Sequence, residues 1–448
     1  MSTVTSLWAG VPGTVSATVR ELGGRRVVLV RIDPARRRGA LDAGAGATLA
    51  AAADVALDAR LPLVGVVASS GADVNDGVAA LHGWGSAARA FARCSGVVPI
   101  LLAVTGPTLS GPALLLGMAD VVVMTADASA YVVGPAAVHS FTGEQVTSEA
   151  LGGASTHGRL SGVAAAVVDD EGAALDLLVA VLGHLPDHCD AEPPHWPTDD
   201  PVDRPTPEAG TVLPDSSTGS YDVRHVARSV VDEGEILELS GGWAPNLITA
   251  FATVGGRPVG IVANQPLALA GSIDIPASQK GARFVSLCDA FNVPLITLVD
   301  TSGFFPGKDR EWRGMIRHGA QLVGAYGRAT VPRVCVVLRK AYGGAYIVMD
   351  SKTMGNDVCL AWPRAELAVM GARQAAEVLH RRDDPEVRAA KEAEYAESLL
   401  NPWRAAERGY VDAVISPADT RLAVAAALEM LRSKRERLPD RAHDNLPL

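Results

Sequence analysis

An internal repeat limits the possible folds of this 448-residue chain more than any other feature. The segment PLVGVVASSG, which starts at Pro62, matches PLITLVDTSG, which starts 232 residues later at Pro294. The next segments also match, VPILLAVTGPTLSGPA from Val98 and VPRVCVVLRKAYGGAY from Val331, and DVVVM then corresponds to DVCLA. Buried strands of unrelated units often share Val, Leu and Ile. Three matches in one order at nearly one spacing nevertheless favour duplication, which predicts two similar halves.

Each half alternates short aliphatic runs with alanine-rich segments of helical character. The runs at 63–69, 97–104 and 294–300 are largely apolar, as expected for parallel strands buried on both faces. This alternation predicts an α/β fold.

A proline-rich segment divides the chain. Eight prolines lie between Pro186 and Pro214 without a sustained apolar period, which indicates a connection rather than a packed element. The sequence therefore predicts an N-terminal domain at 1–220, including a linker at 186–220, and a C-terminal domain at 221–448.

The segment RKAYGGAYIVMDSK, residues 339–352, follows the apolar run 334–338 and contains a glycine pair where a helix is expected to begin. Gly343 and Gly344 would leave backbone N–H groups free of side-chain crowding at a helix N-terminus, which attracts negative charge. Two such donors could hold an oxyanion. The simpler alternative is that the glycines only make a tight connection. Because Gly111 stands opposite Gly344 in the repeat, two anion-stabilising turns per chain are predicted.

Composition and motifs exclude several classes. The net charge of −10 and the lack of a long basic run argue against nucleic acid binding. The five cysteines are scattered without a CxxC motif, which predicts buried thiols in a reducing compartment and no metal site. No signal peptide or membrane-length apolar run is evident, so a soluble cytoplasmic protein is expected. Walker, HExxH and GxSxG motifs are absent, which favours a mechanism that depends on backbone donors.

Several segments together resemble a known family. They are GGWAPNLITAFATVGGRPVGIVANQP, SQKGARFVSLCDAFNVPL, GFFPG, VPRVCVVLRKAYGGAY and AWPRAELAVMGA, with LGGASTHGRLSGVA in the N-terminal half. The chain is similar to the carboxyltransferase β subunits of biotin-dependent acyl-CoA carboxylases of the acetyl- and propionyl-CoA type. Those proteins consist of two tandem crotonase-like domains. The resemblance covers nearly the whole chain.

The resemblance implies that the C-terminal domain receives carboxybiotin on a carrier protein, at a site containing Gly343, Gly344 and Ala345. The N–H groups of Gly344 and Ala345 would stabilise the ureido oxygen, and the N-terminal domain of a neighbouring subunit would bind acyl-CoA and stabilise its enolate. The freed biotin nitrogen would take the α-proton. A biotin carboxylase with its biotin carboxyl carrier would be the partner, and a homohexamer is expected, without a metal. Ile347 falls where family members differ by substrate, and a branched apolar residue is typical of acetyl-CoA or broad short-chain specificity.

The N-terminal half departs from the family pattern. The family's Gly-Gly-Ala turn is Ser110-Gly111-Pro112 here, and proline has no N–H to donate. The N–H groups of Ser110 and Gly111 could still form the oxyanion hole, or the hole could be lost. Asp73 replaces an arginine, so it would repel a polyanionic CoA if it faced the ligand, or would simply face solvent. Ser70 replaces a glycine and Ser302 a proline.

Three readings remain open. The first is a carboxyltransferase that acts on a small acyl-CoA through an enolate. The second is a divergent carboxyltransferase with a non-CoA acceptor, or a non-catalytic partner subunit of a carboxylase complex. The third is a decarboxylase of the same fold that works without biotin, although the intact biotin-side turn argues against it.

Overall fold

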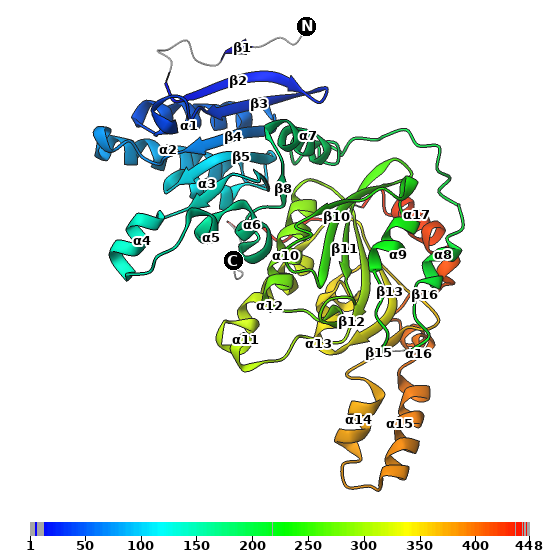
Figure 1. The fold of residues 1–448 in the computed structure, drawn as a ribbon. Coiled ribbons are helices and arrows are strands. Elements are labelled where there is room, and N and C mark those ends of the chain that lie inside the picture. The colour runs from blue at the N-terminus through cyan, green and yellow to red at the C-terminus, as the bar shows by residue number, and fades with distance from the viewer. Residues whose placement is uncertain are drawn as a thin grey trace. The chain divides into compact units, whose positions relative to one another are not determined.

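The computed structural model describes residues 5–6, 13–216, 218–434, 436–440, 442 and 445. The chain forms two compact units (Figure 1). Unit 1 comprises Met1–Pro193, Ser240–Trp243 and Ala290–Asn292, and unit 2 comprises Pro194–Leu239, Ala244–Asp289 and Val293–Leu448. The main division therefore falls inside the proline-rich segment. The domain limits predicted from the sequence, 1–220 and 221–448, stay a prediction, and the outermost residues of both lie outside the described part.

A largely parallel sheet forms the centre of unit 1. Its strand order is β1-β2-β3-β4-β5-β6-β8, and β7 pairs with β5. Strands β3 to β6 run parallel, and the hairpin of β2 and β3 is antiparallel. The strands are β1 (Thr5–Ser6), β2 (Val15–Leu22), β3 (Arg25–Ile32), β4 (Leu63–Ser69), β5 (Ile100–Leu109), β6 (Val121–Thr125), β7 (Ser129–Tyr131) and β8 (Ala166–Val168).

The helices of unit 1 connect these strands. They are α1 (Ala43–Ala59), α2 (Val78–Cys94), α3 (Gly111–Met118), α4 (Pro135–Thr142), α5 (Ser148–Gly152), α6 (Ala154–Thr156) and α7 (Glu171–Leu182). Short turns lie at η1 (Arg37–Gly39), η2 (Val74–Asp76) and η3 (His157–Ser161). Helix α1 begins where the Asp42 side chain accepts a hydrogen bond from the Ala45 N–H, and it ends at Arg60 in the left-handed conformation. Its alanines pack into the apolar core with the strands.

Unit 2 repeats this sheet. Its strand order is β16-β14-β13-β12-β11-β10-β9, and β15 pairs with β13. The strands are β9 (Leu237–Leu239), β10 (Leu247–Val254), β11 (Arg257–Asn264), β12 (Leu295–Thr301), β13 (Arg333–Tyr342), β14 (Val358–Ala361), β15 (Glu366–Ala368) and β16 (Ala413–Val414). The order and directions of β10 to β15 correspond to those of β2 to β7.

The helices of unit 2 include a hairpin, α14 and α15, that extends away from the sheet (Figure 1). The α-helices are α8 (Pro207–Thr211), α9 (Val223–Val230), α10 (Ile275–Ala290), α11 (Lys308–Trp312), α12 (Met315–Arg328), α13 (Gly343–Val348), α14 (Ala372–Leu379), α15 (Pro385–Leu399), α16 (Pro402–Glu407) and α17 (Thr420–Met430). The 3-10 turns are η4 (Asp232–Gly234), η5 (Leu269–Gly271), η6 (Lys352–Met354) and η7 (Pro417–Asp419).

Matching hydrogen bonds support the duplication. The Ile100 N–H donates to the Asp120 carboxylate at 2.8 Å, and the Arg333 N–H donates to Asp357 at the same distance. In each case the carboxylate at the start of one strand fixes the start of its neighbour. The predicted α/β class with two tandem domains of one type is confirmed.

Residues 308–328 form two helices instead of one. Helix α11 ends at Trp312 and α12 begins at Met315, because Gly314 between them has a φ of 90°, a conformation that favours glycine. Strand β2 was not expected, because this half-exposed hairpin strand mixes charged and apolar residues. The sequence signal is strongest for strands that are buried on both faces.

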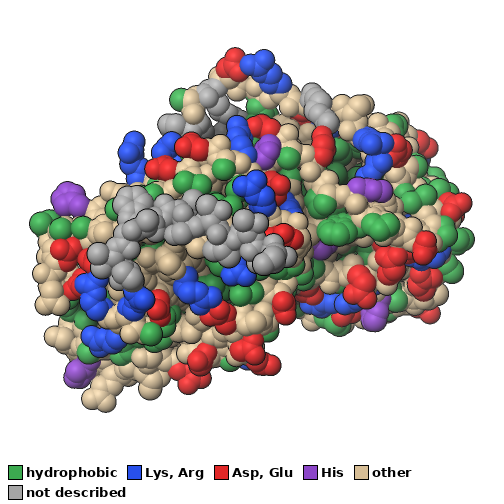
Figure 2. Space-filling view, turned by 90° about the horizontal axis from the view of Figure 1, so that it is seen from above, with side chains coloured by type: hydrophobic (Ala, Val, Ile, Leu, Met, Phe, Trp, Pro, Cys, Tyr) green, Lys and Arg blue, Asp and Glu red, His purple; other side chains and the backbone are tan. Residues whose placement is uncertain are grey.

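The described surface carries both signs of charge. On the face in Figure 2 the Lys and Arg side chains lie among Asp and Glu side chains instead of forming a continuous basic patch. No helix in the described part of the chain is long and apolar enough to cross a membrane. The free thiols of Cys94, Cys288, Cys335 and Cys359 are buried, and Cys189 is half-buried.

Candidate active site

The glycine turn of unit 2 joins β13 to α13 at the carboxyl edge of the sheet. Gly343 has a φ of 60°, Gly344 is exposed and Ala345 is buried. A Cβ added to Gly344 would meet only the Phe304 ring, at 3.6 Å. The first N–H groups of a helix have no partner within the helix. A negatively charged hydrogen-bond acceptor can therefore reach the backbone N–H of the exposed Gly344, where the Phe304 ring lies beside it.

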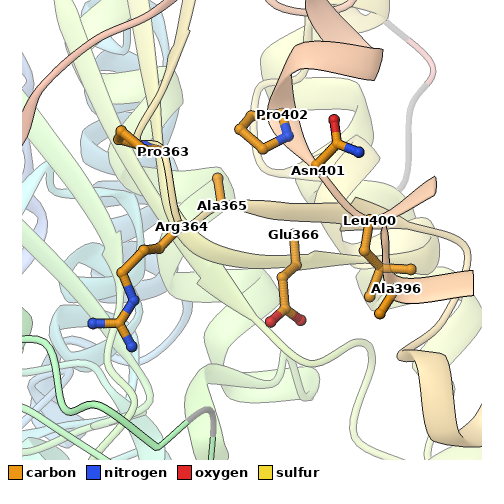
Figure 3. A pocket seen from close by; sticks show the side chains of 8 residues that line it. All are labelled: Pro363, Arg364, Ala365, Glu366, Ala396, Leu400, Asn401 and Pro402. Carbon is orange, nitrogen blue, oxygen red and sulfur yellow. The ribbon is translucent and has the colours of Figure 1, made fainter. Parts of the chain in front are cut away.

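Tyr342, which precedes this turn, is tied to a neighbouring strand. Its hydroxyl donates a hydrogen bond to the Glu366 carboxylate on β15. Burial, together with the Glu366 contact, raises the pKa of Tyr342, so the hydroxyl keeps its proton. Glu366 also lines a hollow of about 210 Å³ (Figure 3). The residues around this hollow are Pro363, Arg364, Ala365, Glu366, Ala396, Leu400, Asn401 and Pro402, which do not include the glycine turn.

A buried ion pair lies below the same turn. The Arg339 Nε donates to Asp300 at 2.9 Å, and both side chains are nearly inaccessible. The Lys340 N–H also donates to Asp300, at 3.2 Å. Burial raises the pKa of Asp300, while Arg339 opposes the change. The pair joins the end of β12 to β13 just before the turn, so it supports the turn without contacting it.

Ile347 lies on α13, three residues after Gly344, and 39% of it is exposed. Residues three apart are neighbours on a helix surface, so Ile347 lies beside the exposed backbone of Gly344. A ligand at that backbone would be within reach of its side chain.

The corresponding turn of unit 1 has the same backbone but fewer available donors. Ser110 has a φ of 58°, close to that of Gly343, and it is not a glycine. Its N–H donates to the Tyr131 carbonyl at 3.0 Å, so this group is already engaged within the fold. Pro112 follows Gly111 at the start of α3 and supplies no donor. Gly111 is therefore the residue of this turn whose N–H is best placed to bind an oxyanion, and the predicted role of Ser110 has no geometric support.

Trp84 on α2 covers Gly111, which sequence reasoning missed. A Cβ added to Gly111 would lie 2.7 Å from Trp84 ring atoms, so glycine is needed at this point of close approach. Gly111 is buried as a result, unlike Gly344. The flanking glycines carry no signal for this contact, because Gly83 packs against the Ala43 backbone and a Cβ on Gly85 would meet nothing within 4 Å.

Asp73 does not take the solvent-facing orientation considered from the sequence. It is 6% exposed, and it accepts a hydrogen bond from Arg37 at 2.7 Å and another from the Asn75 N–H at 3.0 Å. The solvent-facing expectation is therefore wrong. The ligand-facing expectation stays a prediction, and the Arg37 guanidinium would offset the charge of Asp73 toward a ligand. The other substituted residue, Ser302, is exposed, and its hydroxyl donates to the Ala270 carbonyl at 3.4 Å.

Within the described residues, no three His, Cys, Asp or Glu side chains are grouped as metal ligands. The chemistry that the geometry offers is hydrogen-bond donation from backbone to a developing oxyanion at the carboxyl edge of two similar sheets. A duplicated crotonase-like fold with one such turn in each unit defines the carboxyltransferase class.

Comparison with known proteins identifies the family. Residues 11–446 match the carboxyl transferase domain family. The propionyl-CoA carboxylase beta chain of Roseobacter denitrificans is 45% identical over 398 residues, covering 88% of this chain and 78% of the relative. The biotin-dependent acetyl-/propionyl-coenzyme A carboxylase beta5 subunit of Mycobacterium leprae is 40% identical, covering 95% and 81%.

Solved structures agree. The crystal structure of the transcarboxylase 12S hexamer with bound methylmalonyl-coenzyme A has a TM-score of 0.95 and 41% identity, covering 97% of this chain and 85% of that one. The chain belongs to the carboxyl transferase family. Its resemblance to the carboxyltransferase β subunits of biotin-dependent acyl-CoA carboxylases is confirmed.

Proposed function

We propose that this chain transfers a carboxyl group from carboxybiotin to the α carbon of a short-chain acyl-CoA through an enolate. The observation that carries the proposal is the pair of equivalent turns, at Gly111 in unit 1 and at Gly344 in unit 2. A reaction with two carbonyl-derived oxyanions, the ureido oxygen and the enolate, needs two such turns.

Unit 2 is proposed to hold carboxybiotin. The N–H groups of Gly344 and Ala345 stabilise the ureido oxygen, and Gly343 allows the turn its positive φ of 60°. The exposed, side-chain-free Gly344 beside Phe304 leaves room for the planar ureido ring of biotin. When bound, carboxybiotin supplies the carboxyl group and a nitrogen that can accept the α-proton, so the chain needs no strong base of its own.

Unit 1 is proposed to hold the acyl-CoA. The Gly111 N–H donates to the thioester oxygen as the enolate forms. Since Pro112 provides no second backbone donor, this hole holds the oxyanion with one donor fewer than the turn of unit 2.

The acceptor is proposed to be propionyl-CoA, with acetyl-CoA also accepted. The names of the relatives support the first, since they specify propionyl-CoA, acetyl-/propionyl-CoA and methylmalonyl-CoA. Ile347 supports the second, because a branched apolar side chain beside Gly344 adds no charge that would select one short acyl group. A biotin carboxylase with its biotin carboxyl carrier is the proposed partner, and a homohexamer like that of transcarboxylase 12S is the proposed assembly.

One alternative keeps support from a specific observation. Gly111 is covered by Trp84 and the Ser110 N–H is engaged, which favours an acceptor other than an ordinary acyl-CoA, or a non-catalytic role beside an active subunit. An ATP-free exchange assay decides between these functions. Purified protein should transfer carboxyl from methylmalonyl-CoA or malonyl-CoA to free biotin. A folded oligomer that stays silent while an ordinary relative is active would support the alternative.

The Gly344→Pro variant tests the role of the turn. Proline removes one of the two N–H donors, and loss of one oxyanion donor lowers kcat by about 10²–10³-fold in comparable sites. Proline is tolerated in the first turn of helices, so the variant is expected to fold. Circular dichroism and size-exclusion chromatography check folding and assembly. Retained exchange would refute the assignment of this turn.

A further inference from the structure

A turn follows the second strand of the hairpin in each unit. Its backbone conformation is the same in both units, but its side chains are positively charged in unit 1 and uncharged in unit 2. Residues Arg37–Gly39 of unit 1 have φ values of 45°, 55° and 69°, and Leu269–Gly271 of unit 2 have 48°, 51° and 69°. A Cβ on either glycine would lie 2.2 Å from a carbonyl oxygen, that of Ala68 or of Asp300. Leucine and alanine in unit 2 thus adopt the same turn as two arginines in unit 1. The backbone does not explain the arginines.

The turn at Arg37–Gly39 lies at the same sheet edge as the glycine turn of unit 1, Ser110–Pro112. The Ser70 N–H donates to the Arg38 carbonyl at 2.9 Å, and a Cβ on Gly71 would lie 3.4 Å from the Ser110 Cβ. The turns follow β3 and β5, which flank β4 in one parallel sheet. With strands about 4.8 Å apart, the Arg38 backbone lies about 10 Å from the Ser110 turn. Ligands of such sheets bind outside the carboxyl ends of the strands.

The three arginines of this segment differ in their partners. Arg37 pairs with Asp42 and donates to Asp73 at 2.7 Å. Arg36 lies 3.6 Å from an Asp33 oxygen and donates a hydrogen bond to the Gly13 carbonyl at 3.5 Å, with half of its side chain exposed. Arg38 is exposed, and no acidic side chain or carbonyl in the described part of the chain pairs with its guanidinium. The guanidinium of Arg38 is therefore available to bind an anion at this edge.

We propose that Arg38, assisted by Arg36, binds a phosphate group of the acyl-CoA, which rests on the proposed function of unit 1. A guanidinium donates two parallel hydrogen bonds to a phosphate, and an exposed one needs no rearrangement to do so. With the thioester carbonyl at Gly111, the pantetheine arm carries the phosphates away from that turn along the sheet edge. The equivalent turn of unit 2 is uncharged, which suits a ligand without phosphate.

The test compares a thioester with and without phosphates. In the exchange assay, Arg38→Glu should raise the KM for methylmalonyl-CoA by about tenfold or more, because a hydrogen bond to a charged group is lost and a repulsion is added. The KM for methylmalonyl-pantetheine should not change. Arg38→Ala should show the same pattern more weakly, and Ala270 shows that alanine is tolerated in this turn. Arg89→Glu is the matched control, since Arg89 is an exposed arginine of α2.

An unchanged KM for methylmalonyl-CoA in Arg38→Glu, or an equal rise for both thioesters, would overturn the proposal. Calorimetric titration with CoA alone needs no turnover, so it decides the matter even if the wild-type protein proves inactive. Affinity that falls about tenfold in Arg38→Glu, and not in Arg89→Glu, supports the phosphate site. Equal CoA affinity in wild type and Arg38→Glu refutes it. Absence of exchange by the wild type contradicts only the proposed carboxyl transfer.

Discussion

The glycine turns of the two units share a backbone and differ in what they can donate. Ser110 and Gly343 have φ values of 58° and 60°. Gly344 is exposed and is followed by Ala345, whereas Gly111 is buried under Trp84 and is followed by Pro112. The comparison shows that the fold determines the path of the chain at the sheet edge. The number and accessibility of the N–H donors depend instead on individual side chains, here Pro112 and Trp84.

The supports of the two turns differ in the same way. In unit 2 the buried pair of Arg339 and Asp300 joins β12 to β13. In unit 1 the equivalent positions are Gly106 and Ala68, where a Cβ on Gly106 would lie 3.2 Å from the Ala68 Cβ. A buried ion pair is weak evidence for stability, because the desolvation of both charges offsets their attraction. The two turns are therefore supported in chemically different ways, by a buried charge pair in unit 2 and by close packing of small residues in unit 1.

The largest expected effect is on the rate of carboxyl exchange, when the turn of unit 2 receives a proline at the position that corresponds to Pro112 of unit 1. Ala345→Pro removes one of the two N–H donors proposed for carboxybiotin, and exchange should fall by about 10²–10³-fold. The position accepts proline without misfolding, because Pro112 occupies the equivalent place in α3. Steady-state exchange with biotin measures the effect, and circular dichroism checks the fold.

Ala345→Ser is the control, since it keeps the N–H and adds only a hydroxyl. If Ala345→Pro exchanged carboxyl as fast as Ala345→Ser, the second donor would have no role. The two turns would then be functionally alike despite Pro112.

The second effect is a pH dependence of stability that belongs to unit 2. Lys280 on α10 is 4% exposed, and burial lowers its pKa to about 8. Its ammonium donates to the Leu247 carbonyl at 2.7 Å. The folded state binds this proton more weakly than the unfolded state, so the free energy of unfolding should rise as the pH increases from about 8 toward the unfolded value of 10.5. The rise is on the order of 3 kcal/mol.

The equivalent residue of unit 1 is Thr48 on α1, so Lys280→Thr places the neutral residue in both units. Urea unfolding between pH 7 and 10 should show less increase in stability for this variant than for the wild type. The difference between the two curves isolates Lys280 from other groups. Parallel curves would mean that Lys280 is charged, and stabilised, in the folded protein.

The repeat and the buried strands could be predicted because their signals are local. Continuous apolar runs mark β4, β5 and β12, and the glycine pair marks the start of α13. Engagement of the Ser110 N–H could not be predicted, because its acceptor, Tyr131, lies on another strand and carries no signal in its side chain.

The burial of Asp73 shows the same limit. Its partner Arg37 is 36 residues away in a different turn, and the two meet only because β3 and β4 end side by side. The substitution of arginine by Asp73 is visible in the sequence, but the effect of its negative charge depends on the neighbouring Arg37. Propensity identifies elements, whereas the state of a site depends on contacts between them.

The smallest effect tests the different burial of the two glycines. Gly111→Ala would place a Cβ 2.7 Å from the Trp84 ring, while Gly344→Ala would meet only Phe304 at 3.6 Å. Overpacking of this kind costs about 1–3 kcal/mol, so Gly111→Ala should lower the free energy of unfolding by that amount. Neither glycine has a positive φ, so backbone strain does not contribute.

Gly344→Ala should leave stability unchanged or slightly raised, because alanine is the better helix former. Thermal unfolding of both variants and of Gly111→Ala with Trp84→Ala measures the difference. In the Trp84→Ala background, Gly111→Ala should lower the free energy of unfolding by much less than it does in the wild type, since the ring that blocks the Cβ is gone. If Gly111→Ala were as stable as Gly344→Ala, the indole would move aside freely, and the backbone at Gly111 would be as accessible as that at Gly344.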